Sequence, residues 1–362
     1  MKKLLTTLLI ITSTILTSCT SNELKKETET KQTLNESKAI ETLETTTKSK
    51  ETNETANTNI ETTEVLETIK YDSDELLILD TSEPKNIDEK ILFEDSKLYP
   101  KVDGSTALLP LMAQVRSNAL GISLEEAEND TICSKTNFAW DRLFNKNADV
   151  LIVGEMPNEV REELEFQNKN KSVKQQLIYA PIRREGLVFI VNKSNPVENI
   201  TKQQLIDIYT GKITNWKELG GNDAKIEAFQ REEKSGSQTI FRKILMKGIE
   251  PEVKEKMYYP GEMNSLIDVL ASYDNSNNAI GYSVYYYVTQ MYKNDNLKLL
   301  KVEGVMPSND TIADFSYPLL NESYTAIRAD EPVNSPNRKL YDYIRSNQGK
   351  EAVIEAGYVP VK

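Results

Sequence analysis

Residues 187–191, with the sequence LVFIV, form an uninterrupted apolar run of the kind found in strands that are buried on both faces of a sheet. A second, largely apolar run at 148–153 has the same character and ends at Gly154. The spacing of apolar residues in the rest of this region predicts helices at 201–209, 237–246 and 264–273 and strands at 226–229 and 279–284. Strands that alternate with helices indicate an α/β fold with mostly parallel, doubly wound sheets.

Two turns between a predicted strand and a predicted helix carry groups that bind anions. The first is DGST at 103–106, and the second is QREEKSGSQT at 230–239. In open α/β sheets ligands bind beyond the carboxyl ends of the strands, where helix N-termini present free amides. Arg231 adds a permanent, bidentate positive charge to the neutral hydroxyl donors of these turns. The two turns together predict an oxyanion site.

The composition excludes several classes of function. The chain has 362 residues, 44 Lys and Arg against 56 Asp and Glu, two cysteines and no histidine. Without histidine there is no Ser-His-Asp system and no His-ligated metal site. A net charge of −12 argues against nucleic-acid binding, which needs a basic surface. No Walker loop or Gly-x-Ser-x-Gly elbow occurs, so we expect neither an enzyme nor a bound cofactor or metal.

The N-terminal part of the chain has the composition of an export signal followed by a tether. Residues 1–18 combine two lysines with a short apolar run, which is typical of a signal peptide, and LTSC at 16–19 resembles the lipobox of bacterial lipoproteins. This resemblance implies a lipid on Cys19 and a place on the outer face of the cell membrane. Residues 19–70 are rich in Thr, Glu and Lys and are predicted to be a disordered tether. Residues 71–98 form a transitional segment whose short apolar clusters are expected to pack loosely on the domain that follows.

Four motifs in the same order resemble one protein family. They are PIRREGLVFIVN at 181–192, LIDIYTGKITNWKELGG at 205–221, SGSQT at 235–239 and AIGYS at 279–283. Together they resemble the substrate-binding lipoproteins of phosphate ABC transporters, which belong to the type II periplasmic-binding-protein superfamily. The resemblance covers about residues 99–362.

The resemblance implies a two-lobed venus-flytrap domain. The chain would cross between the lobes near Glu185 and again within 308–318. Lobe I would then comprise residues 99–184 and 316–362, and lobe II residues 185–315. A protein of this family encloses inorganic phosphate between its lobes and delivers it to the permease subunits of an ABC transporter. We expect this chain to do the same as a monomer.

The same resemblance assigns the residues that contact phosphate, with hydroxyl donors in both lobes and one arginine as the charge partner. Glu155 would accept a hydrogen bond from the proton that phosphate carries and sulfate lacks. Asn137 is an alternative to its neighbour Thr136. The predicted contacts are Ser105, Thr106, Thr136, Glu155, Arg231, Ser237, Gln238 and Thr239.

The sequence departs from the family pattern at both turns. Gly154 stands where a hydroxyl residue usually precedes the acid, and in the second turn Ser235 replaces an acid and Gln238 a glycine. We therefore expect Glu232 or Glu233 to hold Arg231. The departures leave open a related oxyanion as the ligand. They also leave open a surface adhesion or signalling lipoprotein that keeps the fold and binds another oxyanion or no small ligand.

Overall fold

The computed structural model describes residues 41–46, 66–71, 75–252, 263–272 and 276–361. The predicted signal peptide and Cys19 lie outside these residues. Within them, no helix has the length and apolar content required to cross a membrane.

The helices and strands follow the predicted alternation closely. The helices are α1 (Leu109–Leu120), α2 (Leu124–Asn129), α3 (Thr136–Phe144), α4 (Asn158–Lys169), α5 (Lys202–Tyr209), α6 (Gly236–Ile240), α7 (Met263–Ser272), α8 (Asn309–Ala313), α9 (Pro336–Arg345) and α10 (Asn347–Glu355). The strands are β1 (Glu41–Thr46), β2 (Leu66–Tyr71), β3 (Leu77–Leu79), β4 (Val102–Gly104), β5 (Val150–Val153), β6 (Leu177–Asn192), β7 (Asn199–Ile200), β8 (Glu227–Ala228), β9 (Ala279–Val284), β10 (Leu297–Leu299), β11 (Lys301–Val302), β12 (Leu320–Arg328) and β13 (Val359–Pro360). Short helical turns lie at η1 (Ser96–Leu98), η2 (Thr106–Leu108), η3 (Trp216–Leu219), η4 (Phe241–Met246), η5 (Ser276–Asn278) and η6 (Tyr287–Met291).

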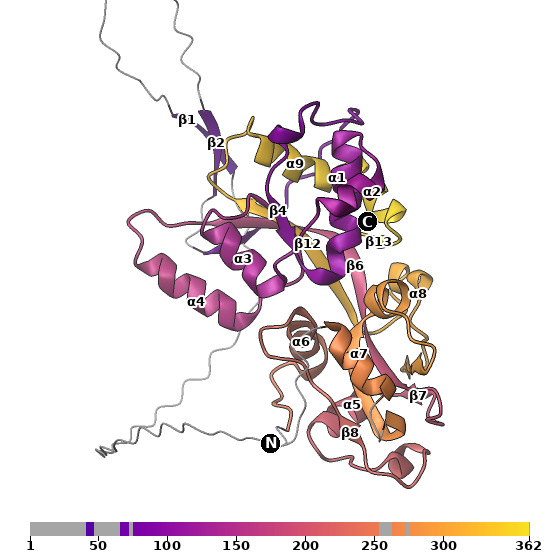
Figure 1. Cartoon of the computed structure of the whole chain (residues 1–362). Helices are drawn as coiled ribbons and strands as arrows, with labels where there is room; N and C mark the ends of the chain where they lie inside the picture. The colour runs from indigo at the N-terminus through magenta and orange to yellow at the C-terminus, as the bar shows by residue number, and fades with distance from the viewer. Residues whose placement is uncertain (1–40, 47–65, 72–74, 253–262, 273–275, 362) are drawn as a thin grey trace, which may run out of the picture. The chain divides into compact units, whose positions relative to one another are not determined.

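Strand β6 organises a nine-stranded sheet in the order β4-β5-β12-β6-β9-β8, and β3, β10 and β13 also pair with it. The pairs β4 with β5, β3 with β6 and β8 with β9 are parallel. The pairs that β6 makes with β12 and β9 are antiparallel. In Figure 1, β6 runs from beside β12 to the neighbourhood of β7, so one strand serves both halves of the sheet.

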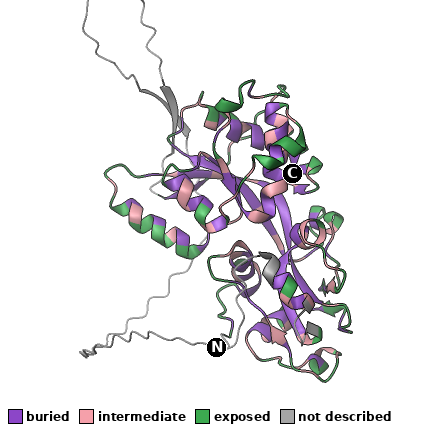
Figure 2. Cartoon of the chain, viewed as in Figure 1, coloured by how far each residue is buried: buried purple, intermediate pink, exposed green. Residues whose placement is uncertain are grey.

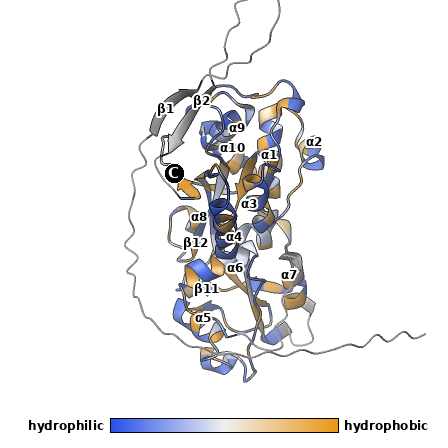
Figure 3. Cartoon of the chain, turned by 90° about the vertical axis from the view of Figure 1, so that its left-hand side faces the viewer, coloured by the Kyte–Doolittle hydropathy of each residue, from blue (hydrophilic) through white to orange (hydrophobic). Residues whose placement is uncertain are grey.

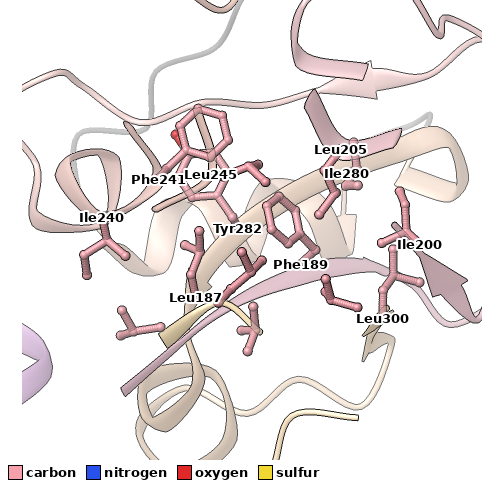
Figure 4. Close-up of a cluster of buried hydrophobic side chains, with 14 of the residues drawn as sticks. Leu187, Phe189, Ile200, Leu205, Ile240, Phe241, Leu245, Ile280, Tyr282 and Leu300 are labelled. Atoms are coloured by element: carbon pink, nitrogen blue, oxygen red, sulfur yellow. The ribbon is translucent and has the colours of Figure 1, made fainter. Parts of the chain in front are cut away.

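The buried side chains fall into two groups that meet along β6. One group comprises two clusters, built from residues 76–182 and 326–358 with Tyr286. The other, built mostly from residues 187–319, surrounds Phe189, Tyr282 and Phe241, whose last two rings stack with centroids 4.3 Å apart (Figure 4). We call the first group lobe I and the second lobe II. The central strands β5, β6, β9 and β12 are largely buried, while most helices keep an exposed face (Figure 2).

The chain passes between the lobes at two neighbouring places. Leu320 pairs with Gly186, and the Leu187 N–H donates to the Leu319 carbonyl oxygen at 2.9 Å. The two connecting segments therefore lie side by side. The exact lobe limits given above, at 184/185 and 315/316, are kept as a proposal.

The start of the predicted transitional segment is docked much more firmly on lobe I than the sequence predicted. Leu76, Leu77 and Ile78 are buried, and β3 pairs in parallel with β6. At the end of β3, the Asp80 carboxylate lies 2.6 Å from the guanidinium of Arg345 in α9, and both side chains are at most 8% exposed. The expectation of loose packing for 71–98 is therefore wrong for residues 75–80.

The central strands are largely hydrophobic, whereas helix α2 is largely hydrophilic (orange and blue in Figure 3).

Two strands lie within the region predicted to be disordered. β1 and β2 pair in antiparallel register, with Glu41 opposite Tyr71 and Thr46 opposite Leu66. The prediction for 19–70 considered only how little apolar surface the segment can bury. Threonine and isoleucine also favour extended backbone, and this preference explains a two-stranded ribbon here.

Candidate functional site

The first turn of the site follows β4 and needs a glycine. A Cβ on Gly104 would lie only 1.9 Å from the Ile152 carbonyl oxygen of β5, so no other residue allows the two backbones to approach this closely. Asp103, buried beside it, accepts hydrogen bonds from the backbone N–H and the hydroxyl of Ser134, each at 2.7 Å. These bonds tie the turn after β4 to the segment that leads into α3.

Two hydroxyls meet at the centre of this turn. The Ser105 Oγ lies 2.8 Å from the Thr136 Oγ1 and accepts a hydrogen bond from the Gly154 N–H at 2.9 Å. Ser105 precedes η2, but its side chain makes no capping bond to that helix. Its hydroxyl instead faces the first residue of α3, so β4, β5 and α3 converge on one polar point.

The second turn belongs to lobe II and touches the first. Ser235 caps α6, and its Oγ accepts a hydrogen bond from the Gln238 N–H at 3.3 Å. A Cβ on Gly236 would lie 2.6 Å from the Thr136 Oγ1 of lobe I. The backbone of the second turn therefore lies directly against the Thr136 hydroxyl, which contacts Ser105 of the first turn, so the two predicted turns are brought together.

A cavity of about 190 Å³ lies between the two turns. Five of the predicted residues line this cavity: Ser105, Thr106, Thr136, Arg231 and Ser237. Asn137, given above as the alternative to Thr136, also lines the cavity. Arg231 is only 5% exposed. The structure thus gathers a cation and several hydroxyls around one cavity.

Gln238 and Thr239 do not line the cavity. Gln238 is fully buried, where its Oε1 accepts hydrogen bonds from the Arg231 N–H at 3.3 Å and from the Tyr282 hydroxyl. Burial raises the pKa of the Tyr282 hydroxyl well above its usual value, so this group stays neutral and donates. The Thr239 hydroxyl donates to the Ser235 carbonyl oxygen within the helix at 3.1 Å. Gln238 therefore positions the Arg231 backbone, and Thr239 stabilises the first turn of α6.

Glu155 also lies away from the cavity. One of its carboxylate oxygens is 2.6 Å from the Nζ of Lys243, a residue of lobe II, and accepts a hydrogen bond from the Tyr324 hydroxyl at 3.3 Å. Burial and the neighbouring Glu155 raise the pKa of Tyr324, so this hydroxyl also stays a donor. The structure places Glu155 in an ion pair between the lobes.

Glu232 and Glu233, the two expected partners of Arg231, lie in different surroundings. Glu233 pairs with Arg242 at 2.7 Å and also accepts a hydrogen bond from Gln238, whereas Glu232 lines the cavity. Arg242 lies in η4, the segment that follows α6, and its pairing with Glu233 could not be seen from the spacing of residues along the chain.

Several residues that line the cavity were not predicted from the sequence. Ser235 and Gly236 do so because α6 begins at Gly236, which turns the first residues of SGSQT toward lobe I. Lys135, which precedes α3, adds a cation. Arg183 and Glu185 line the cavity from β6. Their only signal was the charged pair in PIRREG directly before the apolar run.

Arg183 and Glu185 form a buried ion pair at the crossing between the lobes. The Arg183 guanidinium lies 2.7 Å from the Glu185 carboxylate, and the side chains are 3% and 2% exposed. The Arg183 Nε–H donates to the Ser323 hydroxyl at 3.2 Å, and Glu185 accepts from the Gly186 N–H at 3.0 Å. The pair is therefore internally compensated and adds little net charge to the cavity.

The charge around the cavity is opposite to that of the whole chain. Four cationic residues line it, against two acidic ones; the cations are Lys135, Arg183, Arg231 and Lys234, and the acids are Glu185 and Glu232. Since the chain carries a net charge of −12, this local positive excess is a specific feature of the site. Hydroxyls and cations around an enclosed space can hold a dehydrated oxyanion.

These features define a two-lobed α/β domain with a cavity lined by hydroxyls and cations between its lobes. Residues 96–345 match the family described as "PBP superfamily domain", so the chain belongs to the PBP superfamily. The α/β, two-lobed fold predicted from the sequence is confirmed.

The relatives and solved structures that are similar to this chain include several named as phosphate-binding proteins. The phosphate-binding protein PstS of Bacillus subtilis is 32% identical over 179 residues, which cover 49% of this chain and 55% of that protein. PstS of Borreliella burgdorferi is 23% identical and is covered over 92% of its length. The chain thus spans about half the length of the first relative and nearly all of the second.

A solved structure of a putative phosphate ABC transporter substrate-binding protein from Clostridium perfringens, with bound phosphate, is similar to this chain with a TM-score of 0.53 and 26% identity. The similarity covers 72% of this chain and 98% of that one. An ABC-type phosphate transport receptor from Vibrio cholerae shares the fold with a TM-score of 0.51 over 71% of this chain and 98% of that chain, at 23% identity. The resemblance seen in the sequence motifs is confirmed.

Proposed function

We propose that the protein captures inorganic phosphate between its lobes and delivers it to the permease of an ABC transporter, as a binding protein rather than an enzyme. The single observation that carries this proposal is the convergence of the two turns. Ser105 and Thr136 from lobe I meet Ser235, Gly236 and Ser237 from lobe II at a cavity with excess positive charge. The relatives named as phosphate-binding proteins support the choice of anion.

Isothermal titration calorimetry with inorganic phosphate tests the function. We expect one phosphate to bind per chain. A parallel titration with sulfate, which is also a tetrahedral anion, provides the comparison. Absence of heat with phosphate would remove the proposed function. It would favour the alternative of an adhesion or signalling lipoprotein that kept the fold and changed or lost its ligand.

Gly236→Ala is expected to weaken phosphate binding by about 5- to 150-fold, because overpacking a tight contact costs roughly 1–3 kcal/mol. The new methyl group would meet the Thr136 Oγ1 at 2.6 Å and hold the two turns apart. Calorimetry of Gly236→Ala, Thr136→Ala and the double variant measures the effect. Thr136→Ala makes room but also removes a hydroxyl of the site, so Gly236→Ala should weaken binding less in the Thr136→Ala background than in the wild-type background. Wild-type affinity in Gly236→Ala would show that the turns do not meet in the bound protein.

We also propose that the mature protein is a lipid-anchored monomer on the outer face of the membrane, with the lipid on Cys19. The motif LTSC at 16–19 supports this proposal. Cys19→Ala is expected to release the protein from the membrane fraction or leave it uncleaved, because acyl chains contribute about 0.8 kcal/mol per buried CH₂ to anchoring. Fractionation followed by immunoblotting measures this. A variant that sediments with membranes at the mature size would refute the anchor.

A further inference from the structure

The cavity is larger than inorganic phosphate requires. A protein cavity of about 150 Å³ holds benzene, which has six heavy atoms. At the same ratio the 190 Å³ between the two turns holds about seven or eight heavy atoms. Inorganic phosphate has five. Space for two or three further atoms therefore remains beside a bound phosphate.

The lining of the cavity also includes an apolar wall beside its polar groups. Leu108 follows the first turn in η2, Ile240 ends α6, and Val284 ends β9; all three are buried and line the cavity together with Ala107. An oxygen of a dehydrated phosphate that faced these side chains would lose its hydrogen bonds to water and gain none. An organic substituent facing them would bury apolar surface instead.

The register of the sheet places this apolar wall near the crossing between the lobes. Val284 pairs with Leu187, two residues after Glu185 on β6. The Arg183–Glu185 ion pair therefore lines the same end of the cavity as Val284. Because the two charges compensate each other, this end does not attract a second anionic group. It suits a short uncharged substituent.

We propose that the site takes phosphonates and phosphate monoesters with a substituent of two or three heavy atoms, as well as inorganic phosphate. The phosphoryl oxygens bind at the two turns and Arg231, and the substituent lies against Leu108, Ile240 and Val284. This inference rests on the proposed function, since the same turns hold the phosphoryl group.

Competition titrations with inorganic phosphate, ethylphosphonate and phenylphosphonate test the proposal on the whole protein. We expect ethylphosphonate to bind within about threefold of phosphate or more tightly. It lacks one of the four oxygens of phosphate, but its ethyl group is buried against the apolar wall. One methylene in an apolar pocket changes binding by roughly 10- to 200-fold, which is enough to offset that loss. Phenylphosphonate, whose six-carbon ring exceeds the space, should bind at least tenfold more weakly than ethylphosphonate. If phosphate binds and ethylphosphonate binds 100-fold more weakly, the inference is overturned while the proposed function stands. If neither binds, the proposed function itself fails.

A variant that fills the apolar end gives a second readout. Val284→Leu should weaken the binding of ethylphosphonate at least tenfold and change the affinity for phosphate less than threefold. The control is Val288→Leu. Val288 belongs to lobe II but does not line the cavity, so this variant should change neither affinity. Ala107→Val fills the same end from lobe I and replaces Val284→Leu if that variant does not fold. Equal losses for both ligands in the filled variant would show that the substituent does not lie against this wall.

Discussion

Arg231→Ala is expected to weaken phosphate binding by about 30- to 4,000-fold, because removing one partner of a buried charge pair costs roughly 2–5 kcal/mol. The side chain is 5% exposed and lines the cavity, so a bound anion would have no water to replace it. The backbone of Arg231 is held by Gln238 and by the Tyr282 hydroxyl, at 3.3 and 3.2 Å, which keeps the loop in place when the side chain is removed. Calorimetry at two ionic strengths measures the loss.

Two further variants separate charge from geometry at this position. Arg231→Lys keeps the positive charge without the planar fork, so it should recover only part of the affinity. Lys225→Ala, which removes an exposed cation of lobe II outside the cavity, should leave binding unchanged. An Arg231→Ala variant that binds phosphate as tightly as the Lys225→Ala control would show that Arg231 does not face the anion.

Asp80→Ala is expected to lower the free energy of unfolding by about 3–5 kcal/mol, because it leaves a buried charge without its partner. Arg345 loses the carboxylate at 2.6 Å, and the Tyr341 hydroxyl loses its acceptor at 2.9 Å. Urea denaturation measures the change, and hydrogen exchange should show faster exchange in β3.

Lys85→Ala is the matched control for Asp80→Ala. Lys85 pairs with Asp342 of the same helix α9 at 2.7 Å, but its side chain is 59% exposed. Exposed ion pairs contribute about 0–1 kcal/mol, so the control should be close to wild type. Equal effects of the two substitutions would mean that the start of the transitional segment is not anchored through Asp80.

The sequence predicted the elements of lobe II well because their apolar periodicity is clear. The helix expected at 264–273 is α7 (Met263–Ser272), and the strand expected at 279–284 is β9 (Ala279–Val284). The short strand β3 could not be predicted in the same way. Its three apolar residues follow a long Thr- and Glu-rich region, and their burial depends on pairing with β6, about 100 residues further along the chain.

The two turns that form the site could be predicted from the sequence. Which side chains of each turn line the cavity could not be predicted. Serine and threonine are equivalent donors in a sequence, and only the start of α6 at Gly236 decides that Ser235 rather than Thr239 lines the cavity. Glu155 shows the second limit. Its partner Lys243 is 88 residues away, so no local pattern could reveal that its carboxylate is engaged between the lobes.

The docking of β3 also determines how mechanical tension from residues 1–74 would enter the fold. β3 runs parallel to β6, so a pull on residue 75 acts along both strands and loads their hydrogen bonds in shear, all at once. The Asp80–Arg345 pair lies beyond the loaded strand and resists the same displacement. Because β3 pairs with residues 177–179, the load enters the sheet at the lobe I end of β6, ahead of the segments that connect the lobes at 186–187 and 319–320.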